Sequence, residues 1–130
     1  MQTFHPHMSY ELTAKSLDYR RLGKQRVECK QILTALLGRT TGWANHPVTR
    51  RWSGHERQLC QYAIAICEEW LARGFRDSLL PYFKEQLSEL VFDEYSNDMP
   101  NWLTEEFCEG HKLLLYRKDP VYYRAWRKEK

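Results

Sequence analysis

Residues 17–39, LDYRRLGKQRVECKQILTALLGR, carry the helical pattern around which the rest of the chain is organised. With 100° of rotation per residue, one side of such a helix is apolar and consists of Leu22, Cys29, Leu33, Leu36 and Leu37. A polar row along one flank is formed by Arg21, Gln25 and Glu28, and further round lie Arg20, Lys24 and Gln31. The stretch therefore predicts one long helix with a core-facing stripe and a cationic face that suits an anionic partner.

The ends of this helix are marked by residues with known capping preferences. Asp18 is a suitable N-cap and Gly38 a suitable terminator. Gly23 lies inside the pattern, where glycine costs about 1 kcal/mol relative to alanine. Its presence predicts either that the helix begins after it or that a backbone or a ligand approaches it closely.

Two further helices have N-caps that the sequence identifies. Ser9 can cap a short helix over residues 10–15, which leaves residues 1–8 as an extended arm. Thr104 can cap a helix over residues 105–118, after which Asp119 and Pro120 restart a last helical turn or two.

The middle of the chain predicts the most buried helix. Asn45 can cap a helix that has Pro47 in its first turn and continues, with a flexion at Gly54, to Arg73. Apolar residues between 59 and 71 form a stripe so wide that this helix is expected at the centre of the protein. A shorter helix is expected over residues 79–90, and VFDEYSNDMP at 91–100 mixes β-formers with turn residues and is expected to be non-helical. The fold class predicted is all-α: a compact single-domain bundle over residues 1–130, with about four to six helices and long loops.

Composition restricts the classes of protein. The chain has 130 residues, 42% of them hydrophobic, and no apolar run approaches the roughly 20 residues that span a bilayer. The N-terminus MQTFHPHMSY lacks the layout of a signal peptide, and the four cysteines show no C-x-x-C pairing and no histidine at zinc-ligand spacing. We therefore expect reduced, buried thiols in a cytoplasmic protein, with no metal and no cofactor.

The charge distribution says more than the net charge of +3. Residues 17–57 and 112–130 are rich in Arg and Lys, whereas residues 85–109 are rich in Asp and Glu. This segregation indicates one basic and one acidic face, and the alternative is ordinary solvated charge.

No nucleotide-binding glycine loop, zinc signature or nucleophile elbow is present, so candidate chemistry rests on a few residues. Glu28 lies four residues after Lys24 and is either half of a salt pair or a catalytic carboxylate that stabilises a developing cation. His46 is either a capping residue or part of a site, and His111 lies near an apolar stripe, where a packed histidine competes with a catalytic one.

The order of these features resembles the pyrimidine-dimer DNA glycosylase family, the phage endonuclease V type, over nearly the whole chain. The matching segments are a short N-terminal arm and helix, YRRLGKQRVE, GRTTGWANHP, WLARGF, and MPNWL followed by EGHKLLLYRKDPVYY. The resemblance implies a small all-α protein that binds DNA, extrudes a base and cleaves the glycosidic bond. It also implies that the N-terminal α-amine attacks the anomeric carbon to form an imine, with possible strand elimination, while a Glu on the basic helix stabilises the charged intermediates. An α-amine suits this because its ordinary pKa of about 7.7–8.0 leaves a useful neutral fraction.

The sequence departs from the family pattern at two places. Family members expose Thr after Met removal, whereas Gln2 follows Met1 here, and methionine is normally retained before so bulky a residue. The attacking amine is then that of Met1, unless Lys24 substitutes after desolvation. Pairing YRRL with the family's Y-R-E-L places Arg21 at the acid position, whereas the longer ungapped stretch running back from NHP places Glu28 there, and we prefer Glu28.

Three functions remain open from the sequence. The first is a DNA base-excision glycosylase, possibly also an abasic-site lyase, acting on a damaged or modified pyrimidine, with Met1 and Glu28 as catalytic residues. The residues expected to contact DNA are Arg20, Arg21, Lys24, Gln25, Arg26, His46, Arg50, Arg51, His111, Arg117 and Lys118. The partner expected is double-stranded DNA bound by a monomer, with no membrane. The second function is a DNA-binding module of the same fold without catalysis, and the third is a helical protein-interaction domain that uses the acidic segment.

Overall fold

The computed structural model describes residues 1–91 and 95–127, and the long basic stretch is a single helix in it. This helix, α2 (Tyr19–Leu36), begins after the N-cap Asp18, whose side chain accepts from the Arg21 N–H, and Gly38 follows it with a φ of 73°. Gly23 lies inside α2, so the alternative in which the helix begins after it is wrong. A Cβ at this position would lie 2.9 Å from a ring carbon of Trp70, so the close approach is made by a side chain.

The predicted flexion at Gly54 is a complete break between two helices. One is α3 (Pro47–Trp52) and the other is α4 (Glu56–Ala72), and Gly54 between them has a φ of 83°. The N-cap of α3 is His46, whose Nδ1 accepts from the Val48 N–H at 3.2 Å, so the prediction of Asn45 as the cap is wrong.

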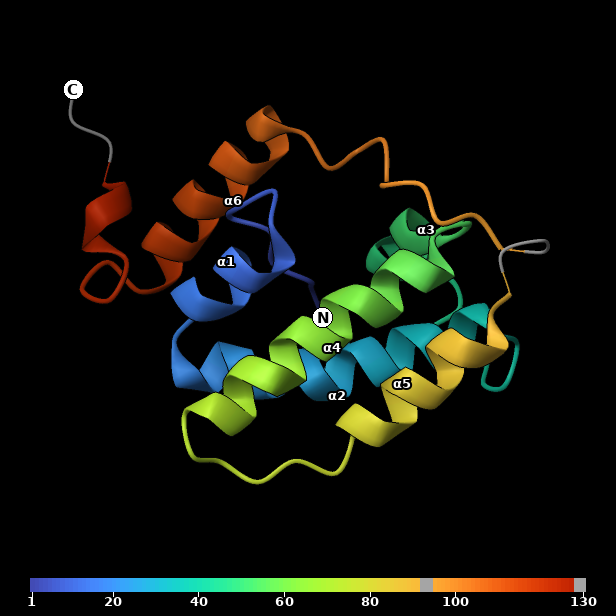
Figure 1. The fold of residues 1–130 in the computed structure, drawn as a ribbon. Helices are drawn as coiled ribbons and strands as arrows, with labels where there is room; N and C mark the ends of the chain where they lie inside the picture. The colour runs from blue at the N-terminus through green and yellow to red at the C-terminus, as the bar shows by residue number, and fades with distance from the viewer. Residues whose placement is uncertain (92–94, 128–130) are drawn as a thin grey trace.

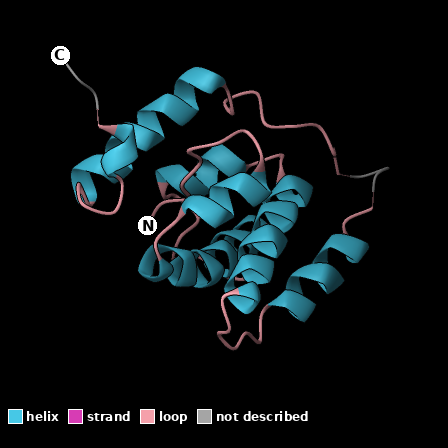
Figure 2. Cartoon of the chain, turned by 60° about the vertical axis from the view of Figure 1, so that its left-hand side comes forward, coloured by secondary structure: helices cyan, strands magenta, loops and turns pink. Residues whose placement is uncertain are grey.

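The remaining elements agree with the sequence to within one residue at most of their ends. They are α1 (Tyr10–Ser16), α5 (Leu80–Glu89), α6 (Glu105–Lys118) and a 3₁₀ turn, η1 (Arg124–Trp126). Within the described residues there are six α-helices and no strand, which confirms the all-α prediction (Figure 2). Residues 92–94, part of the segment predicted to be non-helical, lie outside the described residues.

Helix α4 is the central element, as its wide apolar stripe predicts. It packs against α1, α2 and α5, and residues such as Leu59, Tyr62 and Ile66 are completely buried. Helix α6 lies on the side of α1, away from α5 (Figure 1). The four cysteines are buried and free.

The N-terminal arm is part of the core rather than a free extension. Residues 3–6 are buried, and Thr3 and His5 are completely so. Across the described residues, no helix is long and apolar enough to cross a bilayer.

Candidate functional site

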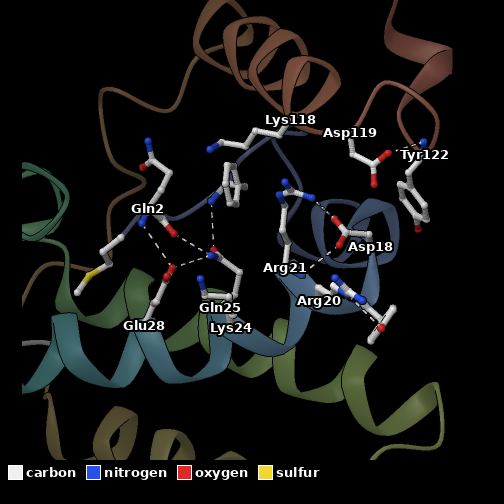
Figure 3. A pocket seen from close by; sticks show the side chains of 13 residues that line it. Gln2, Asp18, Arg20, Arg21, Lys24, Gln25, Glu28, Lys118, Asp119 and Tyr122 are labelled. Carbon is white, nitrogen blue, oxygen red and sulfur yellow. Dashed lines mark hydrogen bonds and ion pairs between the residues drawn. The ribbon is translucent and has the colours of Figure 1, made fainter.

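A groove of about 620 Å³ lies between the arm, α2 and the end of α6 (Figure 3). We call it the α2 groove. Its lining residues are Met1, Gln2, Phe4, Asp18, Tyr19, Arg20, Arg21, Lys24, Gln25, Glu28, Lys118, Asp119 and Tyr122. Both residues predicted to be catalytic and five of those predicted to bind DNA are therefore brought together in one place.

One end of the groove is formed by the arm and Glu28. The Gln2 N–H lies 3.4 Å from Glu28 Oε2, and Gln25 Nε2 donates to the same oxygen at 3.0 Å. Met1, half-buried and packed against the core, lines this end as well. The carboxylate of Glu28 thus faces the chain terminus. Among the described residues it forms no ion pair with Lys24, so the salt-pair interpretation of Glu28 is wrong.

Gln25 fixes the arm to this carboxylate. Its Nε2 also donates to the Gln2 carbonyl at 2.7 Å, and its Oε1 accepts from the Phe4 N–H at 3.1 Å and from the Tyr62 hydroxyl at 2.7 Å. The side chain is 1% exposed and its amide is fully used within the protein. Gln25, expected among the DNA-contacting residues, therefore holds the arm.

The arm has a second attachment at Arg51. Its guanidinium Nη2 donates to Gln2 Oε1 at 2.9 Å, to Thr3 Oγ1 at 2.7 Å and to the Thr3 carbonyl at 3.1 Å. The guanidinium also lies over the rings of Trp102 and Phe107, with its carbon 4.7 Å and 5.1 Å from the ring centroids. Burial lowers the pKa of Arg51 to about 10, so it stays charged at neutral pH. Arg51, which was expected to contact DNA, therefore holds the arm in place.

Two buried histidines, His5 of the arm and His111 of α6, are held in the neutral form. His5 is completely buried, and its backbone N–H donates to His111 Nδ1 at 2.9 Å. Burial, with a smaller contribution from the charge on Arg51, lowers the pKa of His111 to about 4 and holds the pKa of His5 well below its usual value. His111 is 7% exposed and serves as a hydrogen-bond acceptor for the arm rather than as a surface contact.

The opposite end of the groove is closed by the segment after α6. The Tyr123 hydroxyl accepts from the Asp18 N–H at 2.9 Å and donates to the Asp18 carboxylate, and the Tyr122 hydroxyl lies 3.3 Å from the Leu17 carbonyl. Burial alone would raise the pKa of Asp18, but hydrogen bonds from Tyr123 and Arg21 outweigh it and hold the pKa below its usual value. Arg21 donates to Asp18 at 3.1 Å, so its charge is partly neutralised there.

Three cations of the groove have no carboxylate partner. Arg20, Lys24 and Lys118 are exposed, and in the described part of the chain none of them forms an ion pair. Arg20 Nε donates to the Tyr19 hydroxyl at 3.1 Å, which leaves its charge uncompensated. These side chains are available to phosphates, in agreement with the charge pattern of the sequence.

The other residues predicted to contact DNA lie outside the groove. Arg26 pairs with Asp77 at 2.7 Å on the far side of α2, and its guanidinium carbon lies 4.9 Å from the centroid of Trp70. His46 caps α3, and Arg50 donates to the Asn45 carbonyl at 2.9 Å. Arg117 is exposed and lines a separate hollow beside Trp102.

Several residues that shape the site are not evident in the sequence. Thr3 accepts from Arg51 and from Trp52 Nε1, the latter at 3.0 Å, and Tyr62 donates to the Phe4 carbonyl at 2.8 Å. The only sequence signal for this role is the placement of polar residues at positions that a helical stripe or an apolar arm would bury. Asp119 and Tyr122, at the far end of the groove, belong to the RKDPVYY segment that the resemblance includes.

Among the described residues, no cluster of three or more His, Cys, Asp or Glu side chains could hold a metal ion. The donors in the α2 groove are mainly nitrogen cations, and they suit an anionic ligand.

The chain was compared with protein families, curated proteins and solved structures. A family model described as pyrimidine dimer DNA glycosylase matches residues 1–81, which include the arm, α2 and α4. No curated protein and no solved structure is significantly similar to the chain.

Proposed function

The chain belongs to the pyrimidine dimer DNA glycosylase family, and on this basis we propose that it is a base-excision glycosylase for a damaged or modified pyrimidine, acting through an imine on its N-terminal amine. The observation that carries the proposal is the position of Glu28. Its Oε2 lies 3.4 Å from the Gln2 N–H, one residue from the chain terminus, in a groove that Met1 also lines. We take the substrate to be double-stranded DNA in a bacterial or phage-infected cell, bound by one copy of the chain.

The proposed chemistry uses only groups of the α2 groove. The neutral Met1 amine attacks C1′ of the target deoxyribose, and the bond between C1′ and the pyrimidine breaks. The base leaves with the bonding electron pair and takes up a proton. The amine gives up its two protons, one to the departing base and one to O4′ as the C1′–O4′ bond breaks and the sugar ring opens, and this leaves an imine between the chain and C1′. Water can hydrolyse this imine, or loss of a proton from C2′ can expel the 3′ phosphate and cut the strand.

Glu28 is assigned to charge stabilisation. Positive charge develops on the sugar as the base leaves and persists on the protonated imine, and a fixed carboxylate lowers the energy of both species. Gln25 keeps the Glu28 carboxylate and the Gln2 backbone in a constant relation, because its Nε2 donates to both. Arg20, Arg21, Lys24 and Lys118 are assigned to phosphate binding.

Borohydride trapping tests the proposal. The protein is incubated with duplexes that carry a cyclobutane dimer, a series of other damaged or hypermodified pyrimidines, or an abasic site, and hydride then reduces any imine to a stable amine. We expect a covalent adduct of one chain per strand, attached at residue 1 when the adduct is sequenced by mass spectrometry. Attachment at Lys24 would assign the nucleophile to that side chain instead.

Two variants sharpen the test. Glu28→Gln is expected to reduce the rate of adduct formation by about 100-fold or more. Glu68→Gln makes the same chemical change at an exposed carboxylate of α4, outside the groove, and is expected to leave the rate unchanged. An additional residue before Met1 should displace the amine and abolish the adduct.

The runner-up function is a DNA-binding module without catalysis. The observations that favour it are Gln2 in place of an exposed Thr, and Arg21 at the acid position in the alternative alignment. Tight, salt-dependent binding to DNA without any trapped adduct on the whole set of substrates would support the module and reject the glycosylase.

A further inference from the structure

The α2 groove is long, and its two ends have different chemistry. The α2 segment that lines it runs from Tyr19 to Glu28, preceded by the N-cap Asp18. The ten residues of helix from Tyr19 to Glu28 correspond to about 15 Å. Each nucleotide of a duplex strand advances about 3.4 Å along the axis, so this length accommodates roughly four nucleotides.

The arm meets only one end of this length. Gln2 contacts Glu28 and Gln25, whereas the segment after α6 contacts the opposite end through Tyr122 and Tyr123 (Figure 3). No residue of α2 beyond Glu28 lines the groove. A sugar held at the chain terminus would therefore lie at an end of the groove and not at its middle.

On α2, the groove cations that form no ion pair within the described residues lie on one side of the Glu28 end of the groove, in the direction of Asp18. Lys24 is one helical turn from Glu28, and Arg20 is two turns from it, in the direction of Asp18. Lys118, from the end of α6, lies across the groove from α2, and its side chain extends towards the arm at Gln2 (Figure 3). Beyond Glu28, the nearby Arg51 is committed to Gln2 and Thr3 and is not available to a phosphate.

From this arrangement we propose that the protein has a one-sided footprint: its groove binds the phosphates of about three to four nucleotides on one side only of the reacting sugar. The inference rests on the proposed function, because the chain terminus defines where the reacting sugar lies. It adds which part of the substrate is recognised. Lys24 and Lys118 bind the phosphates nearest the reacting sugar, and Arg20 binds one further along the same strand.

Neutral phosphate replacements test the footprint. One methylphosphonate linkage at a time is placed at each of the four positions on either side of an abasic site, and both DNA affinity, by fluorescence anisotropy, and the rate of borohydride trapping are measured with the full chain. We expect losses of about ten-fold at two or more positions on one side and less than two-fold at every position on the other. Equal sensitivity on the two sides would overturn the proposal.

A matched pair of variants assigns the contacts. In Lys118→Ala, one methylphosphonate position on the sensitive side should lose its effect, since the cation that reads the phosphate is gone. Lys84→Ala removes the same charge from an exposed position on α5, outside the groove, and should leave all eight effects unchanged. If Lys118→Ala alters none of them, the groove is not the binding surface.

The two readouts separate the inference from the function. One-sided losses in affinity without any trapped adduct would support the footprint while rejecting the glycosylase. Adduct formation with symmetric losses would support the glycosylase while rejecting the footprint, and absence of DNA binding at low salt would reject both.

Discussion

The two sides of the N-terminal arm use polar residues in opposite ways. On the inner side, Thr3 and His5 are completely buried; Arg51 Nη2 and Trp52 Nε1 donate to Thr3 Oγ1, and the His5 backbone N–H donates to His111 Nδ1. On the outer side, facing the α2 groove, Lys24 and Lys118 are exposed and form no ion pair within the described chain. The inner side therefore determines where the chain terminus lies, and the outer side is free to bind a ligand.

This difference separates residues that look alike in the sequence. Arg26 and Lys24 are two positions apart on α2, yet Arg26 pairs with Asp77 while Lys24 faces the groove. Changes on the inner side should accordingly affect folding and the geometry of the terminus, and changes on the outer side should affect the salt dependence of DNA binding. Each of the following predictions tests this separation.

The largest effect that we expect is a loss of folding stability at acid pH, caused by the buried histidines on the inner side of the arm. Since burial lowers the pKa of His111 to about 4, the folded protein keeps the ring neutral, whereas the unfolded chain takes up a proton below about pH 6.5. The contribution of His111 is therefore complete above pH 6.5 and is lost as the pH falls towards 4, by about 1.4 kcal/mol per pH unit and roughly 3 kcal/mol in total. His5, whose pKa is also lowered, adds to this loss.

Urea unfolding between pH 7 and 4 measures the effect. His111→Asn retains an acceptor for the His5 N–H but cannot take up a proton, so its stability should decrease less over this range than that of the parent protein. An unchanged pH dependence in His111→Asn would show that His111 is not held neutral beneath the arm.

The next largest effect is expected at Gln25, which connects the inner and outer sides. Gln25→Leu retains the size of the side chain but removes the hydrogen bonds to Gln2, Phe4, Glu28 and Tyr62. Because a misplacement of about 1 Å can reduce a rate 100-fold, we expect the rate of borohydride trapping to fall by about 10- to 100-fold with DNA affinity nearly unchanged.

Gln58 provides a matched control for this variant. It is 3% exposed and bonds to Tyr10 and to the Asn97 carbonyl, away from the groove. Gln58→Leu, like Gln25→Leu, should lower the free energy of unfolding by about 1–3 kcal/mol, but it should not lower the trapping rate of the folded protein. Equal rates in the two variants would mean that Gln25 only stabilises the fold.

The sequence predicts the helices better than it predicts the arm. The caps Ser9, Asp18 and Thr104 are local signals, and each is confirmed. The helical stripes are local signals too, but they are confirmed only in part, because Leu36 and Leu37 at the end of α2 are half-buried and Leu71 of α4 is exposed. The arm is different, because residues 3–6 are buried only through contacts with residues far along the chain, such as Tyr62 and His111. A pattern within eight residues contains no information about such partners.

The same reasoning applies to the candidate site. The pattern of α2 correctly brings Arg21, Gln25 and Glu28 to one flank, and all three line the groove. It cannot say which polar residues are buried, and so Gln25 and His111 are grouped with the surface cations although they are 1% and 7% exposed. The spacing of charged residues along a helix predicts which face of the helix they share. Whether a given charged side chain is exposed and available to a ligand depends on the residues that pack against it in the tertiary structure.

A smaller effect is expected at Arg51, the cation of the inner side. Arg51→Lys retains the charge but loses the planar group that lies over Trp102 and Phe107 and donates to the arm. The free energy of unfolding should fall by about 1–2 kcal/mol, while the salt dependence of DNA binding stays the same. The neighbouring Arg50→Lys is the matched control: its side chain is exposed, and the change should alter stability by less than about 0.5 kcal/mol. A reduced salt dependence in Arg51→Gln, which removes the charge that Arg51→Lys retains, would place Arg51 among the phosphate contacts.

The smallest effect on stability, and the most direct test of the outer side, is expected for Lys24→Ala. The side chain is exposed and unpaired, so the free energy of unfolding should change by less than about 0.5 kcal/mol. If Lys24 binds one phosphate, the slope of log affinity against log salt concentration should become shallower by about 0.9.

Arg26→Ala, two residues away, should do the reverse. It leaves the carboxylate of Asp77 without its ion-pair partner, so the free energy of unfolding should fall by about 3 kcal/mol. The salt slope should remain that of the parent protein. Measuring both quantities for both variants is decisive, because a shared response would mean that the cations of α2 form one continuous surface and that the separation between the two sides of the arm does not extend along the helix.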